Sequence, residues 1–426
     1  MSEPSQFQAP VGTHDVLAPE SAQWEGLLST FADWAHRYGF SLVITPVFED
    51  VGVFHRGIGE ASDVARKEMY VFKDRGDRTY ALRPEGTAPI VRAFIQHQPT
   101  TPFKAWYFTP SFRYERPQAG RYRQHHQLGV EVLGTDDPAV DVEVITLAQR
   151  FFEAVGLTRF RLLINSMGDA QCRGAYVELL RAHLEAHAGE LCDEHQKTWR
   201  ENPLRVLDCK NVACIAVTER GPMLIDHLCD DCRAHFDAVL GGLGRLGVAS
   251  ELSPRLVRGF DYYSRTTFEF VADALGGAQN AIGGGGRYDG LVEQLGGKPT
   301  SGIGFGSGVE RLLLTREAEG AAALLARHLD VFVVDTTGED AAAVLLDRLR
   351  RAGVSSDRAY DHRSMKAQMK VADKSGARLA LLIGPQELSA GEVTIRDLRS
   401  ADFEQHQRRV ADQDVVSMIL QLLQAK

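Results

Sequence analysis

The sequence predicts an α/β protein built from two parts. Residues 1–325 mix strand-like and helix-like segments and contain a mostly helical stretch at about 170–250, whereas residues 326–426 predict a small separate α/β domain. The chain length of 426 residues exceeds what one simple core normally supports. From about residue 330, strand-like runs such as "DVFVVDTT" and "RLALLIG" alternate with helix-like runs, which is typical of an α/β unit. The run "EGAAALLARHL" at 319–329 is the expected junction.

Composition places the chain among ordinary globular proteins. Hydrophobic residues make up 44% and charged residues 25%, with a net charge of -9. The first residues carry no basic flank or apolar stretch of the signal-peptide type, and no apolar run is long enough to span a membrane. With no export signal, the six cysteines are expected to be reduced, in the cytoplasm. An acidic total does not exclude a nucleic-acid partner, because local basic patches steer polyanions.

The elements of the first part follow from hydrophobic spacing. Residues 21–40 predict an amphipathic helix that Ser21 caps and Gly39 ends. Residues 41–50 predict one strand, in which Pro46 indicates an edge or interface position. Further segments predict a strand, turn and helix at 78–94, two strands at 103–116 and 126–134 around a hairpin, and strands at 156–168, 256–271 and 301–308.

The hairpin concentrates positive charge in an acidic protein. Arginines 113, 116, 121 and 123 surround one Pro-Gln-Ala-Gly turn. Guanidinium groups bind phosphate in a bidentate manner and stay charged in any environment, so the cluster suits a nucleoside triphosphate. The alternative is a solvated charged loop. Because Arg113 alternates with Phe112 and Tyr114, we expect it to face a cavity.

Two glycine patterns are also candidates for ligand contact. Gly302, Gly304, Gly306 and Gly308 recur with period two, so in a strand they share one face and leave a bare surface for a flat ligand. Arg311 follows in the next helix, where it can stack on a base and reach a phosphate. The glycine run 283–286, just before Arg287 and Tyr288, is a second pattern of glycines followed by an arginine. A flexible loop is the favoured interpretation of this run.

At these residues the chain resembles the class II aminoacyl-tRNA synthetases, and within them the bacterial histidyl-tRNA synthetase family. Segments 21–50, 111–134 ("SFRYERPQAGRYRQHHQLGVEVLG") and 302–313 ("GIGFGSGVERLL") are similar to the three class motifs. "LRPEGT" (82–87), "LVRGFDYYSRTTFEF" (256–270) and "GGGGRYDGLVEQLGG" (283–297) resemble stretches typical of the family. The resemblance implies an antiparallel sheet with flanking helices, a helical insertion, a C-terminal α/β anticodon-binding domain, and a homodimer formed through 21–50.

The resemblance also implies a reaction. The family joins L-histidine to ATP as histidyl-adenylate and transfers the histidyl group to tRNA(His), using Mg²⁺ and no organic cofactor. Arg113 and Arg258 match residues that contact the α-phosphate and count as catalytic, and Glu115 matches one that reads the adenine amino group. Arg121 and Arg123 lie on the loop that covers the triphosphate, and Arg311 matches the residue that stacks on adenine. His125 occupies an adenine-facing position where the family usually has phenylalanine.

Histidine recognition is implied for a second set of residues. Glu85, Thr87 and Gln127 match residues that hold the α-amino group, and Glu131 and Tyr263 match the pair that holds the two imidazole nitrogens. Tyr262 lies beside that pair, and Gly86 and Tyr288 complete the predicted site.

The cysteines leave two interpretations open. Cys192-x2-His195, Cys209-x4-Cys214 and Cys229-x2-Cys232 resemble paired zinc ligands. The family does not require a metal here, so we expect no metal and small buried thiols. The alternative is structural zinc at Cys192, Cys209, Cys229 and Cys232.

The C-terminal part carries a basic stripe. Lys366, Lys370 and Lys374 recur at i,i+4 beside Arg363, which predicts one basic helix face for tRNA phosphates; a solvated face is the alternative. Two other functions compete with the ligase. A paralogue with this fold regulates ATP phosphoribosyltransferase, but it lacks the C-terminal domain and the ATP arginines that this chain has. A stand-alone RNA-binding module would not explain the glycine strand or the paired acids.

Overall fold

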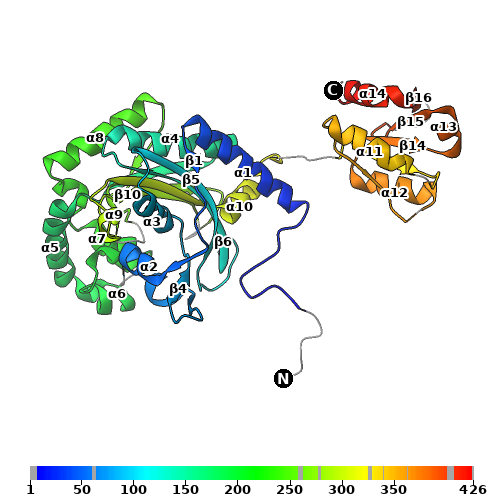
Figure 1. Cartoon of the computed structure of the whole chain (residues 1–426). Helices are drawn as coiled ribbons and strands as arrows, with labels where there is room; N and C mark the ends of the chain where they lie inside the picture. The colour runs from blue at the N-terminus through cyan, green and yellow to red at the C-terminus, as the bar shows by residue number, and fades with distance from the viewer. Residues whose placement is uncertain are drawn as a thin grey trace. The chain divides into compact units, whose positions relative to one another are not determined.

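The computed structural model describes residues 7–59, 64–257, 262–276, 280–324, 329–338, 340–361, 363–400 and 407–424. The chain divides into two compact units, Met1–Leu325 and Ala326–Lys426. Figure 1 shows both units, with the first coloured from blue to yellow and the second from orange to red.

An eight-stranded sheet organises the first unit. Its strand order is β1-β5-β6-β11-β10-β9-β7-β8, and the interior neighbours pair antiparallel. Only the two edge strands, β1 and β8, pair parallel with their neighbours. The strands span Ser41–Leu42 (β1), Phe103–Phe112 (β5), Gln124–Leu133 (β6), Phe160–Ser166 (β7), Glu251–Leu252 (β8), Ser264–Ala272 (β9), Ala281–Arg287 (β10) and Gly302–Gly308 (β11). The antiparallel sheet expected from the sequence is therefore confirmed.

One face of this sheet is covered by helices and forms the main core. The helices are α1 (Glu20–Arg37), α4 (Pro138–Ala154) and α8 (Asp230–Arg245), which pack on the sheet and on one another (Figure 1). Leu128, Val130 and Val132 of β6 enter this core. Because side chains alternate along a strand, Gln127, Gly129 and Glu131 of the same strand face the opposite side. That opposite side carries the candidate site.

The opposite side is bordered by shorter elements. They are α2 (Val51–Ile58), α3 (Thr87–His97), α9 (Leu291–Gln294) and a three-stranded sheet of order β2-β4-β3, with strands Phe48–Asp50 (β2), Val71–Lys73 (β3) and Thr79–Leu82 (β4). The predicted strand, turn and helix at 78–94 are confirmed as β4 and α3. A five-residue π-helical turn, Val64–Glu68, precedes β3.

Two local predictions near the N-terminus were wrong. Residues 41–50 form two strands in different sheets, β1 and β2, with Pro46 between them, because proline cannot donate to a strand ladder. Helix α1 begins at Glu20 after Pro19, so the predicted cap Ser21 lies inside the helix. The helix ends as expected before Gly39, whose φ of 77° suits glycine.

The glycine run at 283–286 is not a flexible loop, contrary to our prediction. It lies in the middle of β10, between β9 and β11. A Cβ atom at Gly285 would lie 1.9 Å from the carbonyl oxygen of Gly304. Glycine therefore allows close approach of two strand backbones.

The predicted helical insertion follows β7. It consists of α5 (Ala170–Ala186), α6 (Asp193–Thr198), α7 (Val212–Glu219) and α8, linked by the short 3₁₀ segments Ala188–Glu190, Pro203–Asp208 and Leu224–His227. These elements enclose a small core of their own around Tyr176, Leu180 and Trp199.

The second unit is an α/β domain, as the sequence predicts. Its five strands have the order β13-β12-β14-β15-β16 and span Val331–Asp335 (β12), Ser356–Arg358 (β13), Leu379–Ile383 (β14), Glu392–Asp397 (β15) and Gln407–Ala411 (β16). Helices α11 (Ala341–Arg351), α12 (Met365–Ser375), α13 (Pro385–Ala390) and α14 (Val415–Gln424) complete the unit. Along the described part of the chain, no helix combines the length and apolar character needed to cross a membrane.

Candidate active site

A pocket of about 270 Å³ opens on the free face of the central sheet. Glycines 283 and 284 of β10 and glycines 306 and 308 of β11 form part of its wall. A Cβ atom at Gly308 would meet only Cβ of Arg311, 4.0 Å away. This end of the glycine strand is the open surface that the sequence predicts for a flat ligand.

The rest of the glycine strand is not bare. Cβ atoms at Gly304 and Gly306 would lie 1.6 Å from Glu131 Oε2 and 2.4 Å from Gln127 Nε2. At Gly302 a Cβ atom would lie 2.3 Å from the ring of Tyr288. Glycine at these positions makes room for side chains of the protein itself, which corrects the expectation of one continuous open surface.

Three predicted arginines converge on the pocket. Arg113 follows β5, Arg121 lies in the hairpin loop, and Arg311 lies on α10 (Val309–Glu319). Backbone carbonyls orient two of them, since Arg113 Nε donates to Pro84 O at 2.9 Å and Arg311 Nη1 donates to Ala281 O at 2.9 Å. Burial, aided by the charge of Arg121, lowers the pKa of Arg311. These three guanidinium groups provide hydrogen-bond donors suited to phosphate groups.

Glu115 and Arg123 take different places in the hairpin. Glu115 lines the pocket and pairs with Arg121, with 3.0 Å between Oε2 and Nε. Arg123 is not among the residues that line the pocket in the described chain. Its guanidinium lies 4.0 Å from the ring centre of Tyr114, and its Nε donates to Glu115 O at 3.2 Å. Arg123 therefore holds the hairpin together here.

His125 and its neighbours form another part of the wall. His125 lines the pocket, and burial together with the charge of Arg113 lowers its pKa to about 3, so its ring is neutral at neutral pH. His126 is anchored by Glu310, which accepts from its backbone N–H at 2.9 Å and lies 3.0 Å from its Nδ1. Glu310 and Glu269 also line the pocket, and our sequence reasoning missed both. The position of Glu310 directly before Arg311 in the sequence could have indicated that Glu310 lies near the pocket.

Glu131 lies at the centre of a second, buried cluster on the same face. It is fully buried and accepts from Tyr288 OH at 2.5 Å, from Thr87 Oγ1 at 2.7 Å and from Tyr107 OH at 3.4 Å. Burial raises the pKa of Glu131 to about 8, although the hydrogen bonds oppose the shift. Tyr107, which our sequence reasoning missed, also packs against Gly86, where a Cβ atom would lie 2.4 Å from its ring.

Glu85 and Gln127 border this cluster. Glu85 accepts from the backbone N–H groups of Thr87 at 2.5 Å and Ala88 at 2.8 Å, so it fixes the start of α3. Burial raises the pKa of Glu85, and these two bonds oppose the shift. The side-chain oxygen of Gln127 is buried and accepts no hydrogen bond from the described residues. A buried acceptor in this state favours a ligand with a donor group.

The predicted tyrosines gather beside Glu131. The ring centres of Tyr262 and Tyr263 are 4.6 Å apart, and those of Tyr262 and Tyr288 are 5.9 Å apart. Both Tyr262 and Tyr263 are buried. Arg258, the other predicted catalytic residue, lies outside the described residues.

Arg287 does not repeat the role of Arg311 beside a glycine run. It is fully buried and pairs with Asp141, with 2.7 Å between Nη2 and Oδ2. Asp141 also lies 3.1 Å from His235 Nε2. Arg287 therefore ties β10 to α4 and α8 in the interior.

Outside the pocket, the predicted cysteines and lysines are placed as follows. Cys192 and Cys209 lie in one side-chain cluster and Cys229 and Cys232 in another, so the four do not form one site. Lys366, Lys370 and Lys374 are exposed on α12, and Arg363 precedes that helix. Gln368 and Ala372 are buried on the opposite face of α12, which confirms that the three lysines share one exposed face.

The fold is that of the aminoacyl-tRNA synthetases that the sequence motifs resemble. Residues 12–312 match the family model for histidyl-tRNA synthetase, and residues 329–422 match that for an anticodon binding domain. The chain belongs to the histidyl-tRNA synthetase family.

Individual proteins support the same assignment. A histidine–tRNA ligase of Rhodococcus erythropolis is 49% identical over 409 residues, which are 95% of this chain and 96% of the relative. One of Mycobacterium tuberculosis is 50% identical over 408 residues, or 94% and 96% of the two chains. The crystal structure of apo Staphylococcus aureus histidyl-tRNA synthetase superposes with a TM-score of 0.81 at 34% identity, covering 97% of this chain and 100% of the other.

Proposed function

We infer that the chain is a histidine–tRNA ligase, which activates L-histidine with ATP and transfers it to the 3′ end of tRNA(His). Family membership over nearly the whole chain supports this function. The observation that carries this inference is that one strand borders both the arginine-lined pocket and the buried tyrosine cluster. Gln127 borders the arginine-lined pocket and Glu131 lies in the buried tyrosine cluster, four residues along β6, or about 13 Å apart for an extended strand. That spacing suits a nucleotide and an amino acid bound side by side.

The first step is attack of the histidine carboxylate on the α-phosphorus of ATP. A new P–O bond forms, the bond to the β-phosphate oxygen breaks, and pyrophosphate leaves with its electron pair. Negative charge grows on the α-phosphate oxygens, so fixed guanidinium groups and positioning lower the barrier. We assign this role to Arg113 and, from the sequence resemblance, to Arg258. In the second step a terminal ribose hydroxyl of tRNA attacks the histidyl carbonyl, and AMP leaves.

We assign the remaining pocket residues to ATP. Arg311, next to the open glycine surface, is suited to stack on adenine, and the neutral ring of His125 can face the base without repelling the arginines. Glu115 would read the adenine amino group. Arg121 would contact the terminal phosphates, and Arg123, which stacks on Tyr114, would do so only after the hairpin rearranges.

The buried cluster is assigned to L-histidine. We propose that Glu131 and Tyr263 hold the imidazole nitrogens, with Tyr262 and Tyr288 enclosing the ring. Glu85, Thr87 and the buried oxygen of Gln127 would hold the α-amino group. A side chain without both ring nitrogens would leave a buried partner unsatisfied, which is the physical basis of rejection.

Magnesium fits the acid side chains of the pocket. Mg²⁺ prefers carboxylate and phosphate oxygens, and Glu269 and Glu310 both line the pocket. We propose these two residues as its protein ligands. The ion would supply charge neutralisation at the β- and γ-phosphates.

We further propose a homodimer that forms through residues 21–50. Leu42, Ile44 and Phe48 in this segment are 48%, 83% and 47% exposed, which is unusual for neighbouring apolar residues on a lone subunit. Strand β1 also forms an edge of the central sheet. Two-fold pairing is the commonest form of oligomer.

The second unit is assigned to tRNA recognition. Its match to the anticodon-binding family and the exposed basic face of α12 support this role. A reducing compartment, the cytoplasm, suits the six cysteines, all of which are free thiols.

Two activities of the purified protein test the proposal. It should exchange pyrophosphate into ATP only when L-histidine is present, and it should charge tRNA(His). The regulatory paralogue of ATP phosphoribosyltransferase would bind histidine and do neither. Retention of Arg113, Arg311 and the whole second unit favours the ligase.

A further inference from the structure

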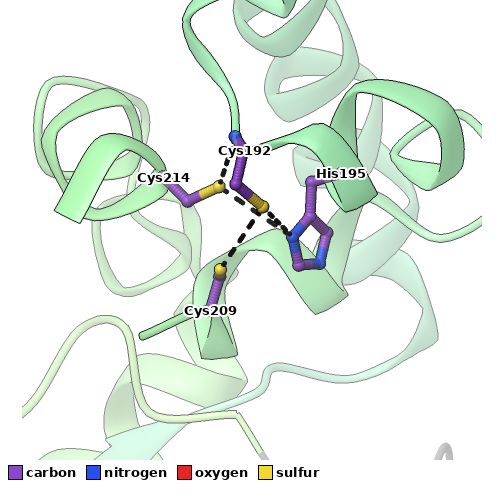
Figure 2. Close-up of side chains that lie close together, drawn as sticks. All are labelled: Cys192, His195, Cys209 and Cys214. Atoms are coloured by element: carbon purple, nitrogen blue, oxygen red, sulfur yellow. Dashed lines mark hydrogen bonds between the residues drawn. The ribbon is translucent and has the colours of Figure 1, made fainter. Parts of the chain in front are cut away.

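All six cysteines of the chain lie in two compact side-chain clusters of the helical insertion. The first cluster contains Cys192, His195, Cys209 and Cys214, and Figure 2 shows their side chains converging on one point. The second contains Asp169, Cys172, Cys229 and Cys232. In each cluster, one ligand-type atom from every residue lies within 4.8 Å of the other three.

The distances in the first cluster match the edges of a zinc tetrahedron. With Zn–S bonds of about 2.3 Å and Zn–N bonds of about 2.05 Å, tetrahedral S···S and S···N edges are about 3.8 Å and about 3.6 Å. Cys192 Sγ lies 4.0 Å from Cys209 Sγ and 3.1 Å from His195 Nδ1, and Cys214 Sγ lies 3.9 Å from the same nitrogen. The four atoms therefore surround a space for one ion.

Helix starts bring three pairs of these ligands together. A residue at the N-cap and the residue three positions later project toward the same point, as in a capping box. Cys192 and His195 occupy these two positions of α6. Asp169 and Cys172 occupy them in α5, and Cys229 and Cys232 in α8.

Both clusters also share the same outer contact. The backbone N–H of Cys192 donates to Cys214 Sγ at 3.3 Å, and the backbone N–H of Cys229 donates to Cys172 Sγ at 3.1 Å. Such N–H···S bonds orient and stabilise metal-bound thiolates. In the second cluster Asp169 Oδ2 lies 3.7 Å from Cys229 Sγ, close to the tetrahedral S···O edge of about 3.6 Å.

Short elements around a small core form the middle of the insertion. Between α5 and α8 lie a six-residue helix, an eight-residue helix and three 3₁₀ segments. Helices this short are unstable without tertiary contacts. Three of the buried residues in the small core are themselves cysteines, Cys172, Cys214 and Cys232. Small folds of this kind use bound metal in place of a larger core.

We propose that the insertion binds two structural Zn²⁺ ions, one held by Cys192, His195, Cys209 and Cys214 and one by Asp169, Cys172, Cys229 and Cys232. Three thiolates with one nitrogen or oxygen ligand in a tetrahedron select zinc over magnesium and calcium. Both sites use four protein ligands, so neither has an open position for catalysis. The two sets also correct the single four-cysteine alternative drawn from the sequence.

The sites would brace the chain beside the tyrosine cluster. Arg255 Nη2 donates to the carbonyls of Leu207 at 2.9 Å and Cys209 at 3.0 Å, so the first site is linked to the chain around Arg255. Arg173, next to Cys172, donates to the carbonyl of Tyr263. If the proposed ligase function holds, zinc loss should raise the KM for histidine more than that for ATP.

Zinc content of the full-length protein tests the proposal without any activity assay. Protein from zinc-supplemented cells is desalted without chelator and measured by elemental mass spectrometry. It should contain two zinc ions per chain. Cys209→Ser and Cys229→Ser should each leave one ion, and the double variant none. The control His227→Asn, which changes an exposed histidine of the insertion, should keep two.

The Asp169 variants keep the test independent of folding defects. Asp169→Cys supplies a fourth thiolate and should retain two ions, whereas Asp169→Ala should hold one. Cobalt refilling of the wild type should give the visible absorption of tetrahedral cobalt thiolate. Wild-type protein without bound zinc, or an intact mass lowered by loss of thiol hydrogens to disulfides, would overturn the proposal. If only one of the variants Cys209→Ser and Cys229→Ser loses an ion, the site altered in the other variant would be refuted.

Discussion

The buried carboxyl group of Glu131 should make the ligand-free protein less stable at neutral pH than its glutamine variant. The side chain is fully buried, and burial raises its pKa from 4.5 to about 8. In the unfolded chain the same carboxyl ionises near 4.5. Between these two values the native state holds a proton that the unfolded state has released. Stability from this group is therefore fully present below pH 4.5 and is lost as the pH rises through 8.

The size of the effect follows from the interval between the two pKa values. Each unit corresponds to about 1.4 kcal/mol, so Glu131 should lower the free energy of unfolding by about 3 kcal/mol at pH 7, relative to a neutral side chain of the same shape. Glutamine keeps an oxygen that can accept from Thr87 and an amide that can donate to Tyr288. Glu131→Gln should therefore be more stable than the wild type at pH 7.

Thermal unfolding without ligand checks this prediction. The difference in Tm between Glu131→Gln and the wild type should be small at pH 5, grow up to pH 8 and stay constant above it. Glu293→Gln, which changes an exposed glutamate on α9, is the matched control and should show no such trend. A glutamine variant that is less stable than the wild type by the same amount at every pH would mean that native Glu131 is ionised.

The same substitution should weaken histidine binding. Because the buried carboxyl is neutral at pH 7, its hydrogen bond to the ligand contributes about 0.5–1.5 kcal/mol, so the KM for histidine in pyrophosphate exchange should rise about 2- to 12-fold, while the KM for ATP changes little. Higher stability with lower affinity would show that burial of this acid is a functional requirement. An unchanged KM for histidine would remove Glu131 from the recognition site.

Three further predictions concern other parts of the chain. Arg258→Ala should bind histidine normally but lose about 3 kcal/mol of transition-state stabilisation, roughly a 100-fold loss of pyrophosphate exchange; near-normal exchange would exclude it from catalysis. Ile44→Asp should convert the dimer to monomers in light scattering, because a charge would enter the proposed interface, whereas Val344→Asp, at an exposed position of α11, should not; a dimeric Ile44→Asp protein contradicts the interface. Deletion of residues 326–426 should preserve pyrophosphate exchange and abolish efficient charging of tRNA(His); loss of exchange in a folded, dimeric truncation would refute this division of roles.

Residues 126–134 illustrate what a local pattern predicts. The alternating apolar residues indicate a strand, and in the structure Leu128, Val130 and Val132 enter the core while Gln127 and Glu131 lie on the opposite face. The family resemblance alone implied the roles of Gln127 and Glu131. The prediction from the arginine hairpin agrees with the structure in part, since Arg113 and Arg121 line the pocket whereas Arg123 stacks on Tyr114. Both signals lie within one strand or one hairpin, where periodicity and charge are local properties.

Contacts between distant segments could not be predicted. Tyr107 lies in the run "FKAWYFTPSF", where nothing distinguishes its hydroxyl from that of a core tyrosine, yet it donates to Glu131. Arg287 follows a glycine run much as Arg311 does, but its partner Asp141 lies 146 residues away. The cysteine spacing indicated zinc-like pairs but could not show which pairs share an ion, since that depends on how α5 and α8 approach each other.

The glycine strand β11 shows why a sequence would accept weak strand residues in the middle of a sheet. Each glycine in a strand interior lowers stability by about 0.5–1 kcal/mol relative to alanine, so four together represent about 2–4 kcal/mol. At Gly304 the missing side chain leaves room for the carboxylate of Glu131, and at Gly306 for the amide of Gln127. At Gly308 the space stays open toward the pocket. In the proposed assignment one strand serves both substrates, because its first glycines admit the side chains assigned to histidine and its last exposes a surface assigned to ATP beside Arg311.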